Sequence, residues 1–308
     1  MSHDHNHGHG HGHGHGHGHD HENDQRRLFI AVGITGGYCL IEFIGGWLTH
    51  SLALLSDAGH MFSDVTAMGL SLFAAYIAAL PVTSQKTFGY YRAEILAALL
   101  NGLSLWLIAG IIFREAYYRF FSPPEVHGQG MILIASIGLG INVLTAWLLH
   151  SARHANLNLH GVFLHVLSDA LGSAGAIVAG VVIVWTGWYW VDPVTSIVIG
   201  GLILLSSFSL VRESVDILMQ ATPRHLNLTE VQQTLEEVAG VKRIHDLHVW
   251  TLSSGLFTLT AHAVVNDETD HHHLLDALEK TIYDRFGIDH ITIQLEPQDR
   301  QSGEPTHF

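Results

Sequence analysis

The chain has 308 residues, of which 48% are hydrophobic and only 14% are charged. Its formal net charge of −14 argues against a nucleic acid as partner, because phosphate backbones attract basic proteins. The single cysteine, Cys39, excludes a disulfide framework and a thiolate-rich metal site. Residues 28–211 are mostly apolar, whereas the two ends carry most of the charge, and this asymmetry indicates a membrane domain with soluble ends.

The N-terminal tail, residues 1–27, has a histidine at every odd position from His3 to His21. Alternating glycines and the absence of apolar residues from 2 to 21 predict that no packed core forms there. The tract is either an expression tag or a natural metal-collecting tail. We favour the second, because tags are usually uninterrupted histidine runs. A loose chelator discriminates poorly among metals, so we expect the tail to be an accessory.

Six apolar segments are predicted to be transmembrane helices, because a span needs about 20 mainly apolar residues. They are Leu28–Leu48, Leu52–Leu80, Ala93–Phe113, Met131–His150, Leu159–Thr186 and Val191–Val211. Together they define a transmembrane domain over residues 28–212. The hydrophilic N-terminus predicts that there is no cleavable signal peptide.

The distribution of Lys and Arg predicts the orientation of these spans. With both ends of the chain inside, six basic residues flank the inner ends of the helices and two flank the outer ends. The positive-inside rule therefore places both termini in the cytoplasm. The inner residues are Arg26, Arg27, Lys86, Arg92, Arg153 and Arg212, and the outer ones are Arg114 and Arg119.

The second and fifth spans each contain a His-x-x-x-Asp motif near the middle, "HMFSD" at His60 and Asp64 and "HVLSD" at His165 and Asp169. Residues four apart lie on one face of a helix. Because charges in hydrocarbon are costly, about 3 kcal/mol each, these faces are expected to turn to the bundle interior. If the two faces lie opposite each other, they supply two nitrogens and two oxygens, which form a complete tetrahedral coordination shell for Zn²⁺.

Two other interpretations of the motifs remain, an interhelical hydrogen bond and a permanently occupied structural zinc. Asp57 lies on the same face as His60 and Asp64 and either lines an exit path or packs at the start of the span. Glu42 is a further polar residue within the spans.

The C-terminal region, residues 213–297, predicts a small cytosolic α+β domain, followed by a flexible tail at 298–308. "NLTEVQQTLEEV" is typical of an amphipathic helix capped by Asn227 or Thr229. "RIHDLHVWTL", "LFTLTAHAVV" and "HITIQLE" predict strands, and "HHHLLDALEKTIYDRF" predicts a second helix, in αββαβ order with a ferredoxin-like fold.

Histidines recur in this domain, and some of them are expected to bind metal while others are ordinary surface residues. On a regular strand His245 and His248 face opposite sides, so both cannot readily serve one site. The set comprises His245, His248, His262, His271, His272, His273 and His290.

The chain resembles the cation diffusion facilitators. The paired motifs on the second and fifth spans, the six spans, the histidine-rich terminus and the cytosolic α+β domain are all similar to that family. The stretches "SLALLSDAGHMFSD", "KTFGYYRAEILAALLNG", "NLHGVFLHVLSDALGS" and "IHDLHVWTL" resemble its zinc-efflux branch.

The resemblance implies a homodimeric zinc/proton antiporter that exports Zn²⁺ across the plasma membrane, the inner membrane of a bacterium. His60, Asp64, His165 and Asp169 match the family's transport site. A histidine at the first of these positions is associated in the family with a preference for zinc over cadmium.

The resemblance also implies a zinc site in the cytosolic domain, at His245, His262 and Glu296. Gln294 stands where some relatives place a ligand histidine. The loop Pro81–Thr87 lacks the His and Asp of an additional loop site found in some relatives.

A transporter is therefore the leading hypothesis, with Zn²⁺ as substrate and regulatory ion. A broader exporter of Co, Ni or Cd and a membrane metal sensor are the alternatives. An intramembrane metalloprotease is disfavoured, because the His-Glu-x-x-His motif is absent and four ligands close the metal site. The sequence thus predicts no enzyme activity.

Overall fold

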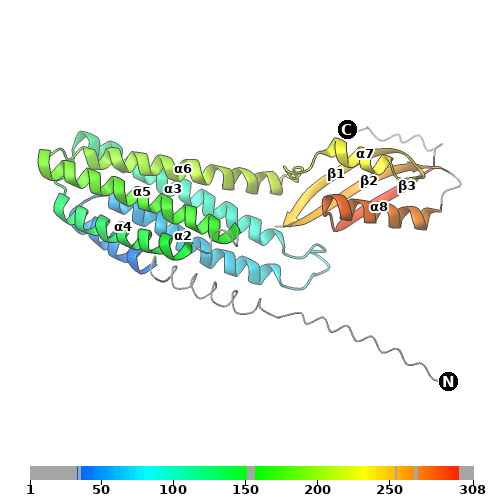
Figure 1. Cartoon of the computed structure of the whole chain (residues 1–308), viewed down its shortest axis with the longest axis horizontal. Helices are drawn as coiled ribbons and strands as arrows, with labels where there is room; N and C mark the ends of the chain where they lie inside the picture. Colours follow the sequence, from blue (N-terminus) through cyan, green and yellow to red (C-terminus); the bar gives the residue numbers. More distant parts are fainter. Residues whose placement is uncertain (1–32, 34–35, 151–156, 254, 267–269, 298–308) are drawn as a thin grey trace, which may run out of the picture. The chain divides into compact units, whose positions relative to one another are not determined.

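The computed structural model describes residues 33, 36–150, 157–253, 255–266 and 270–297, without the side chains of 148–150, 157–162, 164 and 165. Residues 36–49 are helical. Five long helices follow (Figure 1): α2 (Leu52–Ala78), α3 (Arg92–Phe121), α4 (Gly128–His150), α5 (Leu157–Thr186) and α6 (Val191–Leu218).

Each of these five helices is long and apolar enough to cross a membrane. They confirm five of the six predicted spans, while the start of the first expected span lies outside the described residues. Two helices extend by more than one turn beyond their predicted C-terminal ends, since α3 continues to Phe121 and α6 to Leu218. The hydropathy pattern ends with the apolar segment, but charged residues such as Arg114 and Glu115 are compatible with helix and prolong it.

The chain divides into two compact units, Met1–Val65 with Gly110–Gly200 and Thr66–Ala109 with Gly201–Phe308. In the first unit α4 and α5 approach closely at Gly128 and Gly180. A Cβ atom at Gly128 would lie 3.0 Å from the carbonyl oxygen of Gly180, so only glycine fits there without a shift. Small residues of this kind let membrane helices pack backbone to backbone.

Asp192, at the start of α6, caps α2 within the same unit. Its carboxylate accepts hydrogen bonds from the Ser51 hydroxyl at 2.7 Å, the Leu52 amide at 2.7 Å and the Ala53 amide at 3.1 Å. These amides belong to the first turn of α2, where no intrahelical partner exists. Asp192 is fully buried, and Arg119 of α3 lies 3.9 Å from it.

The second unit contains the predicted α-β-β-α-β order: α7 (Leu228–Glu236), β1 (Val241–Ser253), β2 (Leu256–Val265), α8 (His271–Phe286) and β3 (His290–Glu296). The sheet has the order β1-β2-β3, with β1 and β2 antiparallel and β2 and β3 parallel. Asn227 caps α7 by accepting a hydrogen bond from the Thr229 amide, which decides between the two predicted caps.

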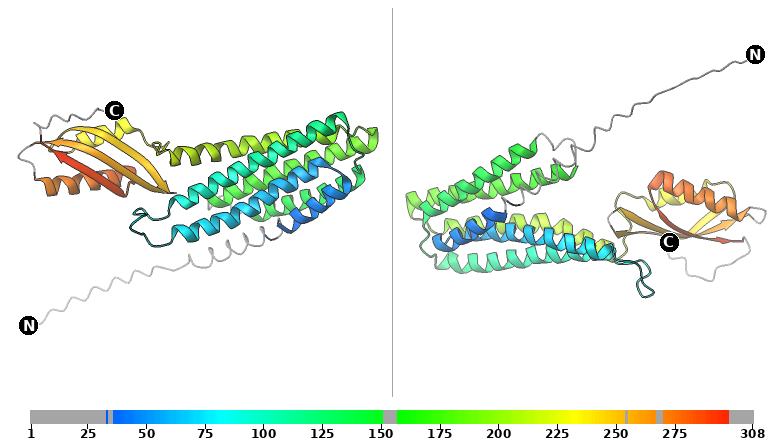
Figure 2. Two further views of the ribbon diagram at one scale, coloured as in Figure 1. Left: turned by 180° about the vertical axis from the view of Figure 1, so that it is seen from behind. Right: turned by 90° about the horizontal axis from the view of Figure 1, so that it is seen from below.

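Both helices lie on one face of the sheet and share a core with it (Figure 2). This core includes four residues of β2: Leu259, Ala261, Ala263 and Val265. The residues that alternate with them along the strand therefore point to the other face of the sheet. We call that other side the open face. The buried core as a whole comprises Val231, Leu235, Ile244, Val249, Leu259, Ala261, Ala263, Val265, Leu274, Leu278, Ile282 and Ile288.

Candidate metal centres

In the first unit the structure brings together residues of both His-x-x-x-Asp motifs. His60 and Asp64 lie on α2 and Asp169 lies on α5. The Nε2 atom of His60 is 3.6 Å from Asp64 Oδ2 and 3.8 Å from Asp169 Oδ1. One imidazole nitrogen thus faces two carboxylates from two different helices.

The fourth predicted ligand, His165, belongs to α5, but its side chain lies outside the described residues. Its backbone position is one helical turn before Asp169, on the same face of the helix. Asp169 is buried, whereas the side chains of His60 and Asp64 are 17% and 26% exposed. The three described residues of the predicted site therefore combine burial with partial exposure.

Asp57 and Glu42 are buried near this site. Asp57 faces α5, because a Cβ atom added to Gly172 would lie 3.3 Å from Asp57 Oδ1. Glu42 is fully buried and accepts a hydrogen bond of 3.2 Å from the Tyr38 hydroxyl. Asp57 therefore packs against the helix that carries Asp169.

The second unit holds another convergence of ligands, on the open face of the sheet. His245 of β1 and His262 of β2 are cross-strand partners, and Glu296 ends β3. His245 Nε2 lies 3.1 Å from Glu296 Oε2, and His262 Nδ1 lies 3.3 Å from Glu296 Oε1. One ligand atom from each residue falls within 4.8 Å of the others, an arrangement that can hold a metal ion.

Gln294 contacts the carboxylate of Glu296. Its amide donates a hydrogen bond of 2.9 Å to Glu296 Oε1. Glu296 is almost fully buried, so this bond and its two histidine neighbours hold the carboxylate in place. Gln294 is thus a positioning residue for the cluster of His245, His262 and Glu296, which we call the triad.

The expectation that His245 and His248 face opposite sides is wrong. The register pairs His245 with His262 and His248 with Thr260, so both histidines lie on the open face. A β-bulge between them inserts one extra residue at Asp246, whose φ is 50°. Strand alternation cannot reveal such an insertion.

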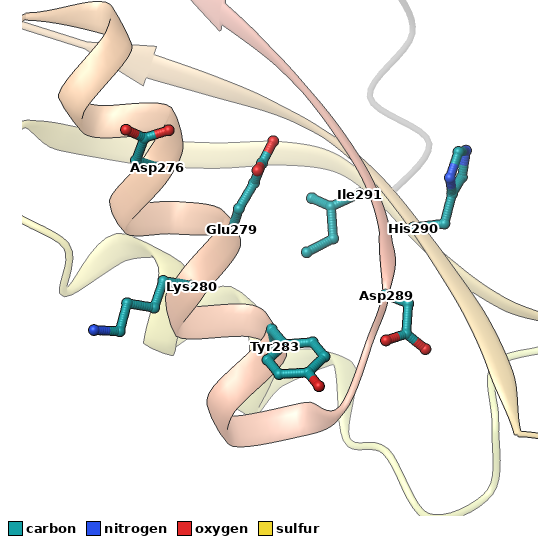
Figure 3. A pocket seen from close by; sticks show the side chains of 7 residues that line it. All are labelled: Asp276, Glu279, Lys280, Tyr283, Asp289, His290 and Ile291. Atoms are coloured by element: carbon teal, nitrogen blue, oxygen red, sulfur yellow. The ribbon is translucent and has the colours of Figure 1, made fainter.

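A pocket of about 460 Å³ lies between α8 and the start of β3 and has no residue in common with the triad (Figure 3). Its acidic side chains, Asp276, Glu279 and Asp289, are spread along its walls, with Asp276 and Asp289 far from each other in the view. Within the described part of the chain they do not belong to a group of three converging metal ligands. The pocket is therefore no candidate metal centre.

Comparison with known proteins defines the class. The family model for the cation efflux transmembrane domain matches residues 28–219, and the model for the cytoplasmic domain of cation efflux proteins matches residues 223–298. The chain belongs to the cation efflux family. It is a multi-pass membrane protein, and the predicted resemblance to the zinc-efflux branch is confirmed.

The relatives are named as transport proteins. The chain is 44% identical over 279 residues to the cadmium, cobalt and zinc/H⁺–K⁺ antiporter of Bacillus velezensis, covering 89% of each protein. It is 42% identical to the metal cation efflux system protein CzcD of Cupriavidus metallidurans, covering 89% of this chain and 87% of CzcD. It is 41% identical to the zinc transporter ZitB of Escherichia coli, covering 90% of this chain and 88% of ZitB.

A solved structure of the metal-bound C-terminal domain of CzcD also matches. It is 39% identical, covers 23% of this chain and 99% of that domain, and has a TM-score of 0.22.

The names of the full-length relatives confirm that this chain is a transport protein and not an enzyme.

Proposed function

We propose that the protein exports Zn²⁺ from the cytoplasm in exchange for protons, through a site formed by His60, Asp64, His165 and Asp169. The observation that carries this proposal is the position of His60 Nε2, within 4 Å of carboxylates on both α2 and α5. Nitrogen and carboxylate oxygen are ligands that zinc accepts in tetrahedral sites. Metal sites near the bilayer midplane between helices are also typical of secondary transporters.

Charge supports the exchange with protons. The two aspartates contribute −2, so a bound Zn²⁺ makes the site formally neutral. An empty site is left at −2 unless protons replace the metal, and such buried charge is costly in a membrane. Because the ligands must be deprotonated to bind zinc, zinc loading releases protons and proton binding favours zinc release.

The remaining parts of the proposal rest on the likeness to the cation efflux family and, for the position of the termini, on the expected topology. The protein acts as a homodimer in the plasma membrane, the inner membrane of a bacterium, with both termini in the cytoplasm. The triad takes a regulatory zinc, because its two nitrogens and one carboxylate provide three ligands and leave one position open. The N-terminal histidines collect metal near the entrance.

Zinc uptake into proteoliposomes tests this function, with the pH on the two sides set independently at zero membrane potential. Acid on the side opposite to zinc should speed transport, because protons replace the ion at its exit. Acid on the zinc side should slow transport, because protons compete with loading. Equal rates in both arrangements would leave a passive carrier and contradict coupled exchange.

A second candidate, a broader divalent-metal exporter, is favoured by the name of the Bacillus velezensis relative, which lists cadmium and cobalt beside zinc. Sites of His and Asp overlap in their affinities for these ions. Competition of Co²⁺ and Cd²⁺ with Zn²⁺ in the same proteoliposomes decides between the two. Inhibition with uptake of the competing ion supports broad export, whereas no uptake of either ion supports zinc selectivity.

A further inference from the structure

The last turns of α6 are long enough to emerge from a membrane. The helix has 28 residues and is therefore about 42 Å long, at about 1.5 Å per residue. The hydrocarbon core of a bilayer is only about 30 Å thick, so about 20 residues cross it. Trp188 and Trp190 stack directly before α6 begins, and such rings favour the membrane interface. Counted from that end, Arg212 and the residues after it lie at the depth of the lipid headgroups.

Arg212 shares a face of α6 with exposed apolar side chains. Phe208 precedes it by four residues and Val215 follows it by three, so the three side chains lie on one side of the helix. Phe208 and Val215 are exposed, as is Leu205 one turn earlier. On a membrane helix, an exposed apolar face of this kind packs against acyl chains. The Arg212 side chain, which is 65% exposed, therefore stands where an acyl chain joins its headgroup.

The segment after α6 brings a second arginine to the same place. Gln220 has a φ of 59°, and its amide donates a hydrogen bond to the Ile217 carbonyl. The Ala221 amide donates to the Asp216 carbonyl at 2.9 Å, which completes a Schellman turn and ends the helix. The redirected chain places the guanidinium group of Arg224 beside the Asp216 carboxylate.

The two guanidinium groups converge on one oxygen atom. Arg212 Nε lies 3.9 Å from Asp216 Oδ2, and Arg224 Nη2 lies 3.0 Å from the same atom. The two nitrogens are therefore at most about 7 Å apart, close enough for one phosphate group to reach both. One carboxylate balances only one of the two positive charges, so the cluster keeps a net charge of +1. Glu213 directly follows Arg212 and therefore points to another side of the helix.

We propose that Arg212 and Arg224 bind the phosphate of an anionic phospholipid whose acyl chain lies along Phe208 and Leu205. Guanidinium groups make paired hydrogen bonds with phosphate and are weakly hydrated, which suits a contact at a membrane surface. Basic residues where a helix leaves the membrane attract anionic lipids. Asp216 has the same sign of charge as the phosphate, so it spaces the arginines without contacting the lipid. This contact goes beyond zinc export and does not depend on it.

The test measures lipid binding to the full-length, detergent-solubilised protein by native mass spectrometry. Phosphatidylglycerol and phosphatidylcholine are titrated separately, and the affinity for the first bound lipid is compared. The wild type should prefer phosphatidylglycerol. Arg212→Gln and Arg224→Gln should each weaken its binding about fivefold, and the double variant roughly 30-fold, because each basic residue contributes separately to the attraction. Binding of phosphatidylcholine should not change.

Arg285→Gln is the matched control. Arg285 belongs to α8, is 58% exposed and lies 3.9 Å from Glu237, so it is also an exposed arginine beside one carboxylate. This variant should keep the wild-type affinity for phosphatidylglycerol. Wild-type affinity in the folded double variant, or an equal loss in Arg285→Gln, would overturn the lipid site. Should the double variant fail to fold, the two single variants decide in the same way.

Competition with inorganic phosphate separates a lipid site from a simple anion site. An excess of free phosphate should not displace phosphatidylglycerol, because free phosphate has no acyl chain to pack along Phe208 and Leu205. Displacement by free phosphate would show an anion site and overturn the lipid. A second copy of this chain that covers this face of α6 would exclude the lipid. The wild type would then show no preference for phosphatidylglycerol, and that result would also overturn the proposal.

Discussion

Replacing Asp192 with Ala should strongly destabilise the membrane domain. The change removes the acceptor for the Leu52 and Ala53 amides and for the Ser51 hydroxyl, all at a buried position. The hydroxyl can rotate to another acceptor, but the two amides cannot. An orphaned buried donor costs about 1–3 kcal/mol, so the two amides together cost about 2–6 kcal/mol.

Tryptophan fluorescence of the detergent-solubilised protein during heating provides the assay, since the chain has seven tryptophans. At about 2–4 °C per kcal/mol for a region of this size, the unfolding midpoint should fall by roughly 10 °C. The unfolding midpoint of Asp192→Asn should lie between those of Asp192→Ala and the wild type, because the amide oxygen of Asn still accepts hydrogen bonds but carries no charge.

Asp216→Ala is the matched control on the same helix. Asp216 is 42% exposed and pairs with Arg224 at 3.0 Å, an ion pair worth about 0–1 kcal/mol. The thermal unfolding midpoint of Asp216→Ala should therefore shift by only a few degrees. If Asp192→Ala lowers the midpoint no further than Asp216→Ala does, the capping argument is refuted.

Three further predictions address selectivity, the tail and a helix cap. His60→Asp should raise cadmium transport relative to zinc, because a third carboxylate changes ligand hardness and makes the occupied site formally −1; an unchanged ratio of transport rates would remove His60 as the selectivity element. Deleting residues 2–21 should slow transport at low zinc but not at saturating zinc; complete loss at saturation, with normal membrane insertion, would make the tail part of the pathway. Hydrogen bonds from the His273 and His272 amides lower the pKa of Asp270 in the folded protein. The stability that this cap contributes is therefore fully present above the unfolded-state pKa, about 4, and is lost as the pH falls through the lowered folded-state pKa. Asp270→Ala should therefore speed amide exchange at both histidines at neutral pH, and unchanged exchange would disprove the cap.

Much of the architecture could be predicted because it depends on local patterns. Long apolar segments select spanning helices, and the spacing of His60 and Asp64 fixes both residues on one helical face. The two cytosolic helices and three strands follow from the same kind of periodicity. The helix ends were less predictable, since α6 continues to Leu218 through residues that hydropathy does not mark.

The features that escaped prediction depend on contacts between distant residues or on backbone irregularity. Asp192 caps a helix that begins 140 residues earlier, and only its acidic character at the start of an apolar span signals a role. The bulge at Asp246 reverses the side on which His248 lies, and the clue was an Asp between two histidines in "HDLH". Gln294 stands at a position where the family resemblance suggests a metal ligand, whereas in the structure its amide hydrogen-bonds Glu296.

Zinc uptake by the Asp169→Asn variant tests the central claim most directly. Asn keeps the size of the side chain but removes one charged ligand, and Asp169 is the buried carboxylate contributed by α5. Since even the supporting partners of metal ligands are worth 10–100-fold, we expect uptake to fall at least about 100-fold. Asp216→Asn is the control, and a thermal midpoint close to wild type confirms folding of both variants. Wild-type uptake by well-folded Asp169→Asn would contradict transport through the His60, Asp64, His165 and Asp169 site.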